Sequence, residues 1–465
     1  MPEATPSVHP YIPNSVPRIK EQMLQEIGAR DAEELYAAIP ERLRFRGKLG
    51  VPEPLRSEYA LRRHVAGLLS RNESCAETLS FLGGGCWQHY VPAVCDEIGN
   101  RAEFVTAYYG ETYSDHGKLQ ALFEYASMIG ELVELDAVSQ PTYDWATAAA
   151  TAISMASRLQ GRGVALVPAS ISPERLSVIR GYCEPRVEVV TVPFDRASGL
   201  LDLGALGGVL STDTACVYVE NPGYLGTIET QAAEIARLAH EAGALSIVGV
   251  DPVSLGVLEA PPRYGADIVC GELQPLGVHM HYGGGLAGFV ATPDDEAYVA
   301  EYPTFLIGLA PTSVEGEYGF GEVVWERMSY VQRGESKEYA GTTQNLWAIV
   351  NAVYLALLGP AGLAELGQGI MQRSQYAAQC LSELPGVTAP ALGAPFFKEL
   401  VVSFEGAGKT VAEVNRALRE RGIFGGKDLS AEFPALGQSA LYCVTEIHTK
   451  ADIDRLTETL REVIA

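Results

Sequence analysis

The sequence is poor in basic residues and lacks a membrane span or an export signal. It has 34 lysines and arginines against 58 acidic residues, a formal net charge of -24 at pH 7. Nucleic acids and anionic membranes attract basic patches, so this balance argues against both as partners. No apolar run reaches the roughly 18 residues that a membrane span needs. The N-terminal segment has no basic region followed by an apolar core, so it is not a signal peptide. We therefore expect a cytoplasmic protein.

Metal-type cysteine spacing and nucleotide-binding motifs are also missing. The eight cysteines include no CxxC pair, and we interpret them as reduced, mostly buried thiols, with no metal site. There is no GxGxxG or Walker motif, so binding of dinucleotides or nucleoside triphosphates has no support.

An alternation of short apolar segments and helical segments begins near residue 140. Hydrophobic residues make up 47% of the 465 residues, enough for a substantial core. The expected strands are 164–167, 187–192, 215–219, 245–250, 268–270 and 287–290. This pattern predicts an α/β fold whose central sheet is mostly parallel, with helices on both faces. Ligands of such sheets sit at the carboxyl ends of strands, where Asn221, Asp251 and Glu272 lie.

Three parts of the chain are predicted. Residues 1–75 form an N-terminal helical arm, residues 76–345 a large α/β domain, and residues 346–465 a connecting helix with a small α+β domain. Helices of the arm are expected at 18–27, 31–39 and 61–69. Such an arm buries little by itself, so we expect it to wrap a partner or a neighbouring domain.

Two loops are candidates for a site. Residues 81–90 hold three glycines beside Trp87, His89 and Tyr90. This loop either lines a cofactor or substrate site or is a tight turn packed by aromatic side chains. Residues 106–117 are polar and lead into a helix expected at 118–135, and polar loops at helix starts often carry site residues. The candidates there are Tyr108, Tyr109, Asp115 and His116.

The stretch 248–288 resembles the heart of a site for pyridoxal phosphate (PLP). In enzymes of the aspartate-aminotransferase type, an aspartate at a strand end pairs with the protonated pyridine nitrogen, and a lysine about 25 residues later forms the Schiff base. Asp251 occupies such a strand end, and a glycine triplet follows at 283–285. Between Gly271 and Gly285, however, there is no lysine.

Short motifs in a fixed order carry a resemblance along nearly the whole chain. They are YIPN at 11–14, SFLG at 80–83, HYVPA at 89–93, EFVTAY at 103–108, LQALFEY at 119–125, YGADIV at 264–269, YLALLG at 354–359 and CVTE at 443–446. Each is weak alone, but the ordered set resembles subunit 1 (alpha) of the two-subunit glycine decarboxylase, the P protein of the glycine cleavage system.

The resemblance implies a PLP-dependent transferase fold of type I. It implies that PLP is bound by a homologous, lysine-bearing beta subunit in an α2β2 heterotetramer, and not covalently by this chain. The implied reaction decarboxylates glycine and passes the aminomethyl group to the lipoyl arm of the H protein. We expect Tyr108, Tyr109, His116 and His89 to contribute to the partner's site, and Asp251 to be a vestigial or weak cofactor contact.

Three departures from the family pattern leave alternatives open. Residues 109–114 and 333–344 differ from the usual loops, and Trp145 replaces a glycine at a helix start, where an indole would obstruct a phosphate. One alternative is a paralogous subunit of a PLP enzyme acting on another small amino acid or amine in specialised metabolism. The other is a non-catalytic scaffold.

Overall fold

The computed structural model describes residues 16–47, 49–105, 116–323 and 337–465. The chain forms two compact units, residues 1–72 and 73–465. Each unit is described by itself.

The described part of the first unit consists of short helices that bury none of their residues. These are α1 (Pro17–Glu26), the 3-10 turns η1 (Glu34–Tyr36) and η2 (Glu41–Leu43), and α2 (Glu58–Leu69). The helix predicted at 31–39 is wrong, since only η1 forms there. A helix of fewer than about 12 residues is marginal in water, because nucleation is costly, unless one of its faces packs against another part of the protein.

A seven-stranded sheet forms the centre of the second unit and confirms the predicted α/β class. The strands follow the order β2-β8-β7-β6-β5-β3-β4. Their bounds are β2 (Ala137–Val138), β3 (Val164–Pro168), β4 (Glu188–Val192), β5 (Thr214–Glu220), β6 (Leu245–Val250), β7 (Ile268–Glu272) and β8 (Gly288–Thr292). Every pair from β4 to β7 is parallel, whereas β8 runs antiparallel to β7 and β2. The strands β5, β6 and β7 are buried throughout.

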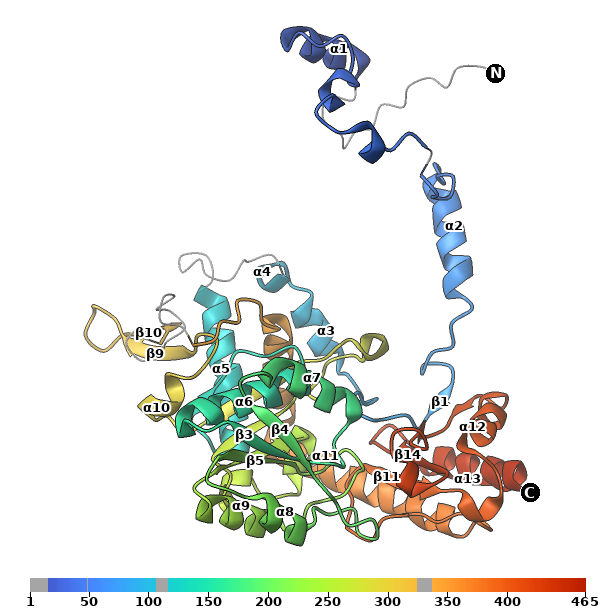
Figure 1. Cartoon of the computed structure of the whole chain (residues 1–465). Helices are drawn as coiled ribbons and strands as arrows, with labels where there is room; N and C mark the ends of the chain where they lie inside the picture. Colours follow the sequence, from blue (N-terminus) through green and yellow to red (C-terminus); the bar gives the residue numbers. More distant parts are fainter. Residues whose placement is uncertain (1–15, 48, 106–115, 324–336) are drawn as a thin grey trace. The chain divides into compact units, whose positions relative to one another are not determined.

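Helices cover both faces of this sheet (Figure 1). They include α6 (Trp145–Gln160), α7 (Pro173–Cys183), α8 (Leu203–Val209) and α9 (Ala232–Glu241). The alanine-rich segment after Tyr143 forms α6, and its N-cap, Asp144, accepts the backbone N–H of Thr147 at 2.7 Å. Alanines 148, 149, 150 and 152 of α6 are fully buried, so the helix can lie close to the strands.

The long helix α11 (Asn345–Ser382) leads from the large sheet to the C-terminal elements. It is kinked at Gly359, which has φ 60° and precedes Pro360. The kink separates two helical segments. By length and composition α11 could cross a membrane, but 44% of its apolar window is buried in the protein, and it packs against α5 (His116–Val133), α3 (Ala93–Gly99) and α13. Its apolar character therefore suits a core helix.

The C-terminal elements form a second, smaller layer with its own apolar core, here called the C-terminal layer (residues 396–465). Its antiparallel sheet has the order β11-β14-β13, and a short parallel pair joins β1 to β12. The bounds are β1 (Leu79–Ser80), β11 (Glu399–Ser403), α12 (Val411–Arg419), β12 (Ile423–Phe424), β13 (Lys427–Asp428), β14 (Ser439–Cys443) and α13 (Lys450–Ile464). The core contains Phe81, Val402, Tyr442 and Leu456.

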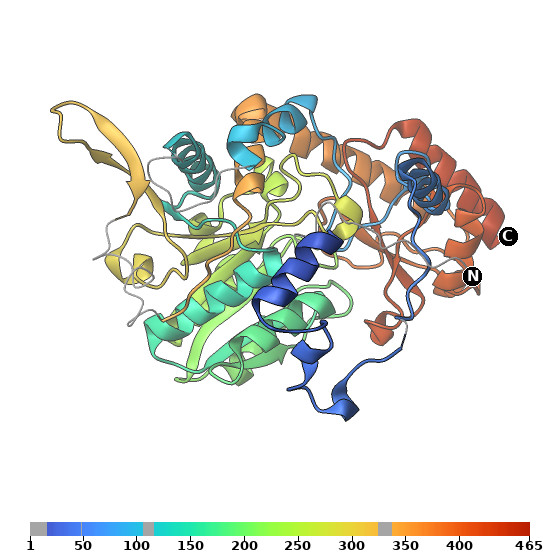
Figure 2. The same ribbon diagram turned by 90° about the horizontal axis from the view of Figure 1, so that it is seen from above.

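A hairpin of β9 (Ile307–Pro311) and β10 (Tyr318–Glu322) extends away from the large sheet (Figure 2). The sequence between 301 and 339 predicts only irregular structure, so this hairpin was missed. Its strands are rich in glycine and largely solvent-accessible, and they lack the alternation of apolar and polar residues that marks a strand.

Candidate functional site

Three acidic side chains stand at the carboxyl ends of neighbouring strands. Glu220 ends β5, Asp251 follows β6 and Glu272 ends β7. The parallel register pairs Glu220 with Gly249 in β6, and Val250 with Gly271 in β7. The exposed fractions of Glu220, Asp251 and Glu272 are only 5%, 3% and 1%. Because a buried carboxylate is costly unless it is paired or hydrogen-bonded, each needs a compensating group.

A lysine from the C-terminal layer compensates Asp251. Oδ1 of Asp251 accepts the backbone N–H of Val253 at 3.1 Å. Oδ2 lies 2.7 Å from Nζ of Lys398, and the two side chains are 4% and 3% exposed. Nζ also lies 3.6 Å from the ring centre of Trp87, a favourable cation–π contact. The aspartate therefore faces a buried ammonium group.

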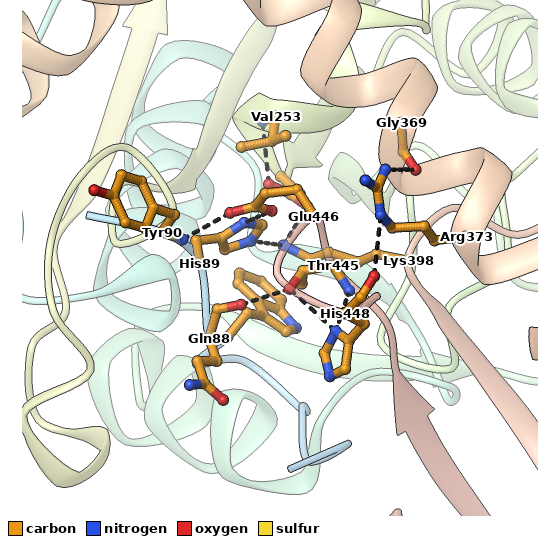
Figure 3. A network of polar contacts seen from close by, with 12 residues as sticks. Gln88, His89, Tyr90, Val253, Gly369, Arg373, Lys398, Thr445, Glu446 and His448 are labelled. Atoms are coloured by element: carbon orange, nitrogen blue, oxygen red, sulfur yellow. Dashed lines mark hydrogen bonds and ion pairs between the residues drawn. The ribbon is translucent and has the colours of Figure 1, made fainter. Parts of the chain in front are cut away.

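The same ammonium group starts a chain of polar contacts that ends at Glu446 (Figure 3). Nζ of Lys398 lies 3.1 Å from Nε2 of His89, and Nδ1 of His89 lies 2.8 Å from Oε2 of Glu446. An ammonium group can only donate, so Nε2 accepts and Nδ1 carries the proton that is donated to Glu446. The backbone N–H of Tyr90 donates to Oε1 at 2.7 Å. Burial raises the pKa of Glu446, but His89 and Tyr90 outweigh burial and lower it to about 2.

Backbone N–H groups surround the carboxylate of Glu272. Its Oε2 accepts from Trp145, the first residue of α6, at 3.1 Å. Its Oε1 accepts from Leu273, Gln274 and Ala287 at 3.2, 3.1 and 2.9 Å. Burial raises the pKa of Glu272 to about 7 against the opposing effect of these donors. The carboxylate thus occupies the anion-binding position at the start of α6.

An arginine compensates Glu220 and packs on a tryptophan. Nη1 of Arg175, in α7, lies 2.5 Å from Oε1 of Glu220, which also accepts from the Tyr218 hydroxyl at 3.0 Å. The guanidinium carbon lies 3.9 Å from the ring centre of Trp145. A Cβ at Gly249 would come within 2.6 Å of Nε1 of Trp145 and of the Tyr218 oxygen. The glycine in β6 therefore leaves room for the indole.

These side chains leave little free space. The cavity between them has a volume of about 20 Å³ and is lined by Gly85, Trp87, Trp145, Arg175, Pro222, Gly223, Tyr224, Gly226, Asp251, Phe397, Lys398 and Glu399. That is room for about one water molecule. The loop at 81–90 lines the cavity through Gly85 and Trp87. It is also held as a packed turn, since the backbone N–H of Gly84 donates to Glu399 at 2.6 Å. In the described residues, no three His, Cys, Asp or Glu side chains are grouped to hold a metal ion.

The fold around this site is that of the PLP-dependent transferases of type I. A sphingosine-1-phosphate lyase from Burkholderia pseudomallei, only 16% identical, superposes with a TM-score of 0.65 over 92% of this chain and 94% of that one. That likeness shows the fold alone. The chain belongs to the glycine cleavage system P-protein family, whose model matches residues 9–460.

Relatives of full length agree with this family. The probable glycine dehydrogenase (decarboxylating) subunit 1 of Staphylothermus marinus is 39% identical over 98% of both chains. The protein of the same name from Pyrococcus horikoshii is 39% identical over 98% of this chain and 99% of its own length. A crystal structure of the glycine decarboxylase (P-protein) of the glycine cleavage system, in inhibitor-bound form, is 35% identical with a TM-score of 0.84, covering 98% of this chain and all of that one. The resemblance inferred from the motifs is thus confirmed.

PLP, the cofactor of this fold family, does not fit the site of this chain. A cavity of about 20 Å³ cannot take a pyridine ring with its phosphate. The aspartate that would pair with the ring nitrogen is already paired with Lys398. Leu276, where a Schiff-base lysine would be expected, is fully buried, and its backbone carbonyl accepts from Asn351 at 2.8 Å.

The other predicted site residues lie apart from this cavity or outside the described residues. Tyr108, Tyr109 and Asp115 fall within 106–115, which the structure does not describe, and His116 begins α5 with its side chain likewise outside the description. His89 has a side chain only 2% exposed, held by Glu446 and Lys398. That these residues contribute to a partner's site stays a prediction.

Three residues that supply charges in the cavity wall and beside it were not predicted from the sequence: Arg175, Lys398 and Glu446. For Lys398 a signal was present. It stands with Glu399 inside an otherwise apolar run, Phe396–Phe404, and charges within such a run are rarely buried without a partner. Nothing local identified the partner, because Asp251 is distant in the chain.

Proposed function

We propose that this chain is subunit 1 of a two-subunit glycine decarboxylase. The observation that carries the proposal is a retained PLP-transferase fold whose own cofactor position is closed by side chains. A chain of this kind is not complete as an enzyme, and the names of its relatives, subunit 1, imply a second subunit.

The second subunit, in this proposal, is a homologous chain that binds PLP through its lysine, and the assembly is an α2β2 heterotetramer. PLP supplies the electron sink for decarboxylation on that subunit. The complex decarboxylates glycine and passes the aminomethyl group to the lipoyl arm of the H protein. We place the complex in the cytoplasm. The exposed apolar residues of the first unit, among them Leu43 and Phe45 at 67%, support a role in contacting other chains.

The test is reconstitution with a lysine-bearing homologue. The complex should exchange the carboxyl carbon of glycine with labelled bicarbonate, and neither chain alone should do so at a comparable rate. Borohydride reduction followed by peptide mapping should find the PLP adduct on the partner. Stoichiometric, lysine-bound PLP on this chain purified alone would refute the proposal. Exchange with another small amino acid but not with glycine would favour the paralogous alternative.

The proposed contributors to the partner's site can be tested in the same complex. Tyr108→Phe, Tyr109→Phe and His116→Gln should each lower the exchange rate at least about tenfold if they touch the reacting groups. His240→Gln is a control, because His240 lies on the exposed side of α9, paired with Asp267. Subunit association, followed by size-exclusion chromatography, should be unchanged in the variants. Normal exchange in all three variants would remove these residues from the site.

A further inference from the structure

The two ionic anchor points of a PLP site survive in this chain, and both are already occupied. We propose that Lys398 and Glu272 take the places of the two ionic groups of the cofactor. Lys398 gives Asp251 the positive charge that a pyridinium would give, and Glu272 gives the start of α6 the acceptor oxygens that a phosphate would give. The inference concerns this chain's own site and does not depend on the amino acid that the complex decarboxylates.

Lys398 is in the wrong place to be a Schiff-base lysine. In PLP the aldehyde lies across the ring from the nitrogen, whereas Nζ lies 2.7 Å from the carboxylate that would pair with that nitrogen. Nζ also contacts the face of Trp87, 3.6 Å from the ring centre. It therefore lies at the nitrogen end of the site and not at the aldehyde end.

Glu272 satisfies the donors that an anion would otherwise need to satisfy. Four backbone N–H groups converge on its carboxylate, one of them from the first residue of α6. A helix start with unpaired N–H groups is an anion site. Trp145 and Arg175 stack on one another beside Glu272 and Asp251. The cofactor position is therefore closed by packed side chains.

The occupied site also fastens the C-terminal layer to the large sheet. Lys398 and Glu446 come from that layer, Asp251 comes from the end of β6, and His89 lies between them. Separating the layers would leave buried charges without partners, which strongly disfavours their separation. We therefore expect these layers not to open and close in this chain.

A double-mutant cycle in the full chain tests the first replacement. Lys398→Met and Asp251→Asn should each raise the equilibrium constant for unfolding in urea at least about 100-fold, because each leaves one buried charge unpaired. The double variant should return to within about tenfold of the unmodified chain. Lys450→Met, which breaks the exposed pair with Asp454, should change the constant less than about fivefold. The proposal is overturned if the double variant is no more stable than the single variants. The same criterion applies if one single variant fails to fold, because the double variant should then still fold.

Small charged or ring-shaped compounds test whether the space left by each removed side chain binds a group of the expected charge. In Lys398→Ala, ethylammonium or pyridine should raise the melting temperature, and in Lys398→Ala with Asp251→Asn they should not. In Glu272→Ala, formate should raise the melting temperature more than in the unmodified chain, with sodium chloride as the salt control. The proposal is overturned if ethylammonium and pyridine shift the melting temperature equally with and without Asp251→Asn. It is also overturned if formate shifts the melting temperature of Glu272→Ala no more than that of the unmodified chain. Because no glycine or partner is present, this result is independent of the exchange assay that tests the proposed function.

Discussion

Glu446→Gln should destabilise the chain strongly at neutral pH and progressively less as the pH falls towards 2. In the fold, His89 and Tyr90 hold the pKa of Glu446 at about 2, against an ordinary value of 4.5. That difference corresponds to about 3 kcal/mol of unfolding free energy at pH 7. Because the folded pKa is the lower one, the contribution is fully present above pH 4.5 and disappears as the pH falls towards 2.

Urea unfolding followed by far-UV circular dichroism measures this contribution. The unfolding free energy of Glu446→Gln should lie about 3 kcal/mol below that of the unmodified chain at pH 7, and only about 2 kcal/mol below it at pH 3.5. Comparing the two chains at each pH removes the effects of all other titrating groups. Glu458→Gln, an exposed position on α13, is the matched control and should change the free energy by less than about 0.5 kcal/mol.

The prediction fails if the difference at pH 7 is below about 1 kcal/mol, or if it does not shrink at pH 3.5. Either result would mean that the ionised carboxylate of Glu446 is not what holds His89 in place. The tautomer assigned to His89 would then also be wrong.

Three further predictions concern the surroundings of the site. Gly226→Ala should lower the unfolding free energy by at least about 3 kcal/mol, because φ is +85° and a Cβ would lie 2.0 Å from the backbone oxygen of Glu399. The control Gly207→Ala, with open space around the glycine, should be neutral or stabilising. Equal effects of the two substitutions in urea unfolding would contradict the steric argument. Asp144→Ala should cost about 1 kcal/mol through loss of the N-cap of α6, measured by urea unfolding, and no change would argue against that cap. Glu220→Gln should cost about 3–5 kcal/mol, because Arg175 would remain buried without its counter-charge. A melting temperature within about 0.5 °C of the unmodified chain (a shift of about 0.5 kcal/mol for a chain of this size) would show that the pair contributes little.

Elements with a strong local pattern could be predicted closely. The strand predicted from the apolar run 245–250 is β6, with those bounds. Of the arm helices, the one expected at 61–69 lies within α2. The hairpin β9–β10 could not be found in this way, because its stability depends on pairing and not on a periodic apolar face.

The candidate site could be predicted only in part. Asp251 is visible in the sequence as an acidic residue at the end of an apolar strand, and the missing lysine is visible as well. The groups that fill the site come from four other parts of the chain, at residues 87, 145, 175 and 398. Each looks ordinary by itself, and only the tertiary fold brings the charges together.

If PLP is bound by the partner, as proposed, the closed cavity beside β6 makes that division between the subunits difficult to reverse. Placing a lysine at Leu276 would supply a nucleophile, but PLP would still find Asp251 paired and the ring position filled by Trp87, Trp145 and Arg175. Removing those side chains one at a time leaves a buried charge or an empty space at each intermediate step. In the proposed function, restoring a PLP site in this chain would therefore require several substitutions at once.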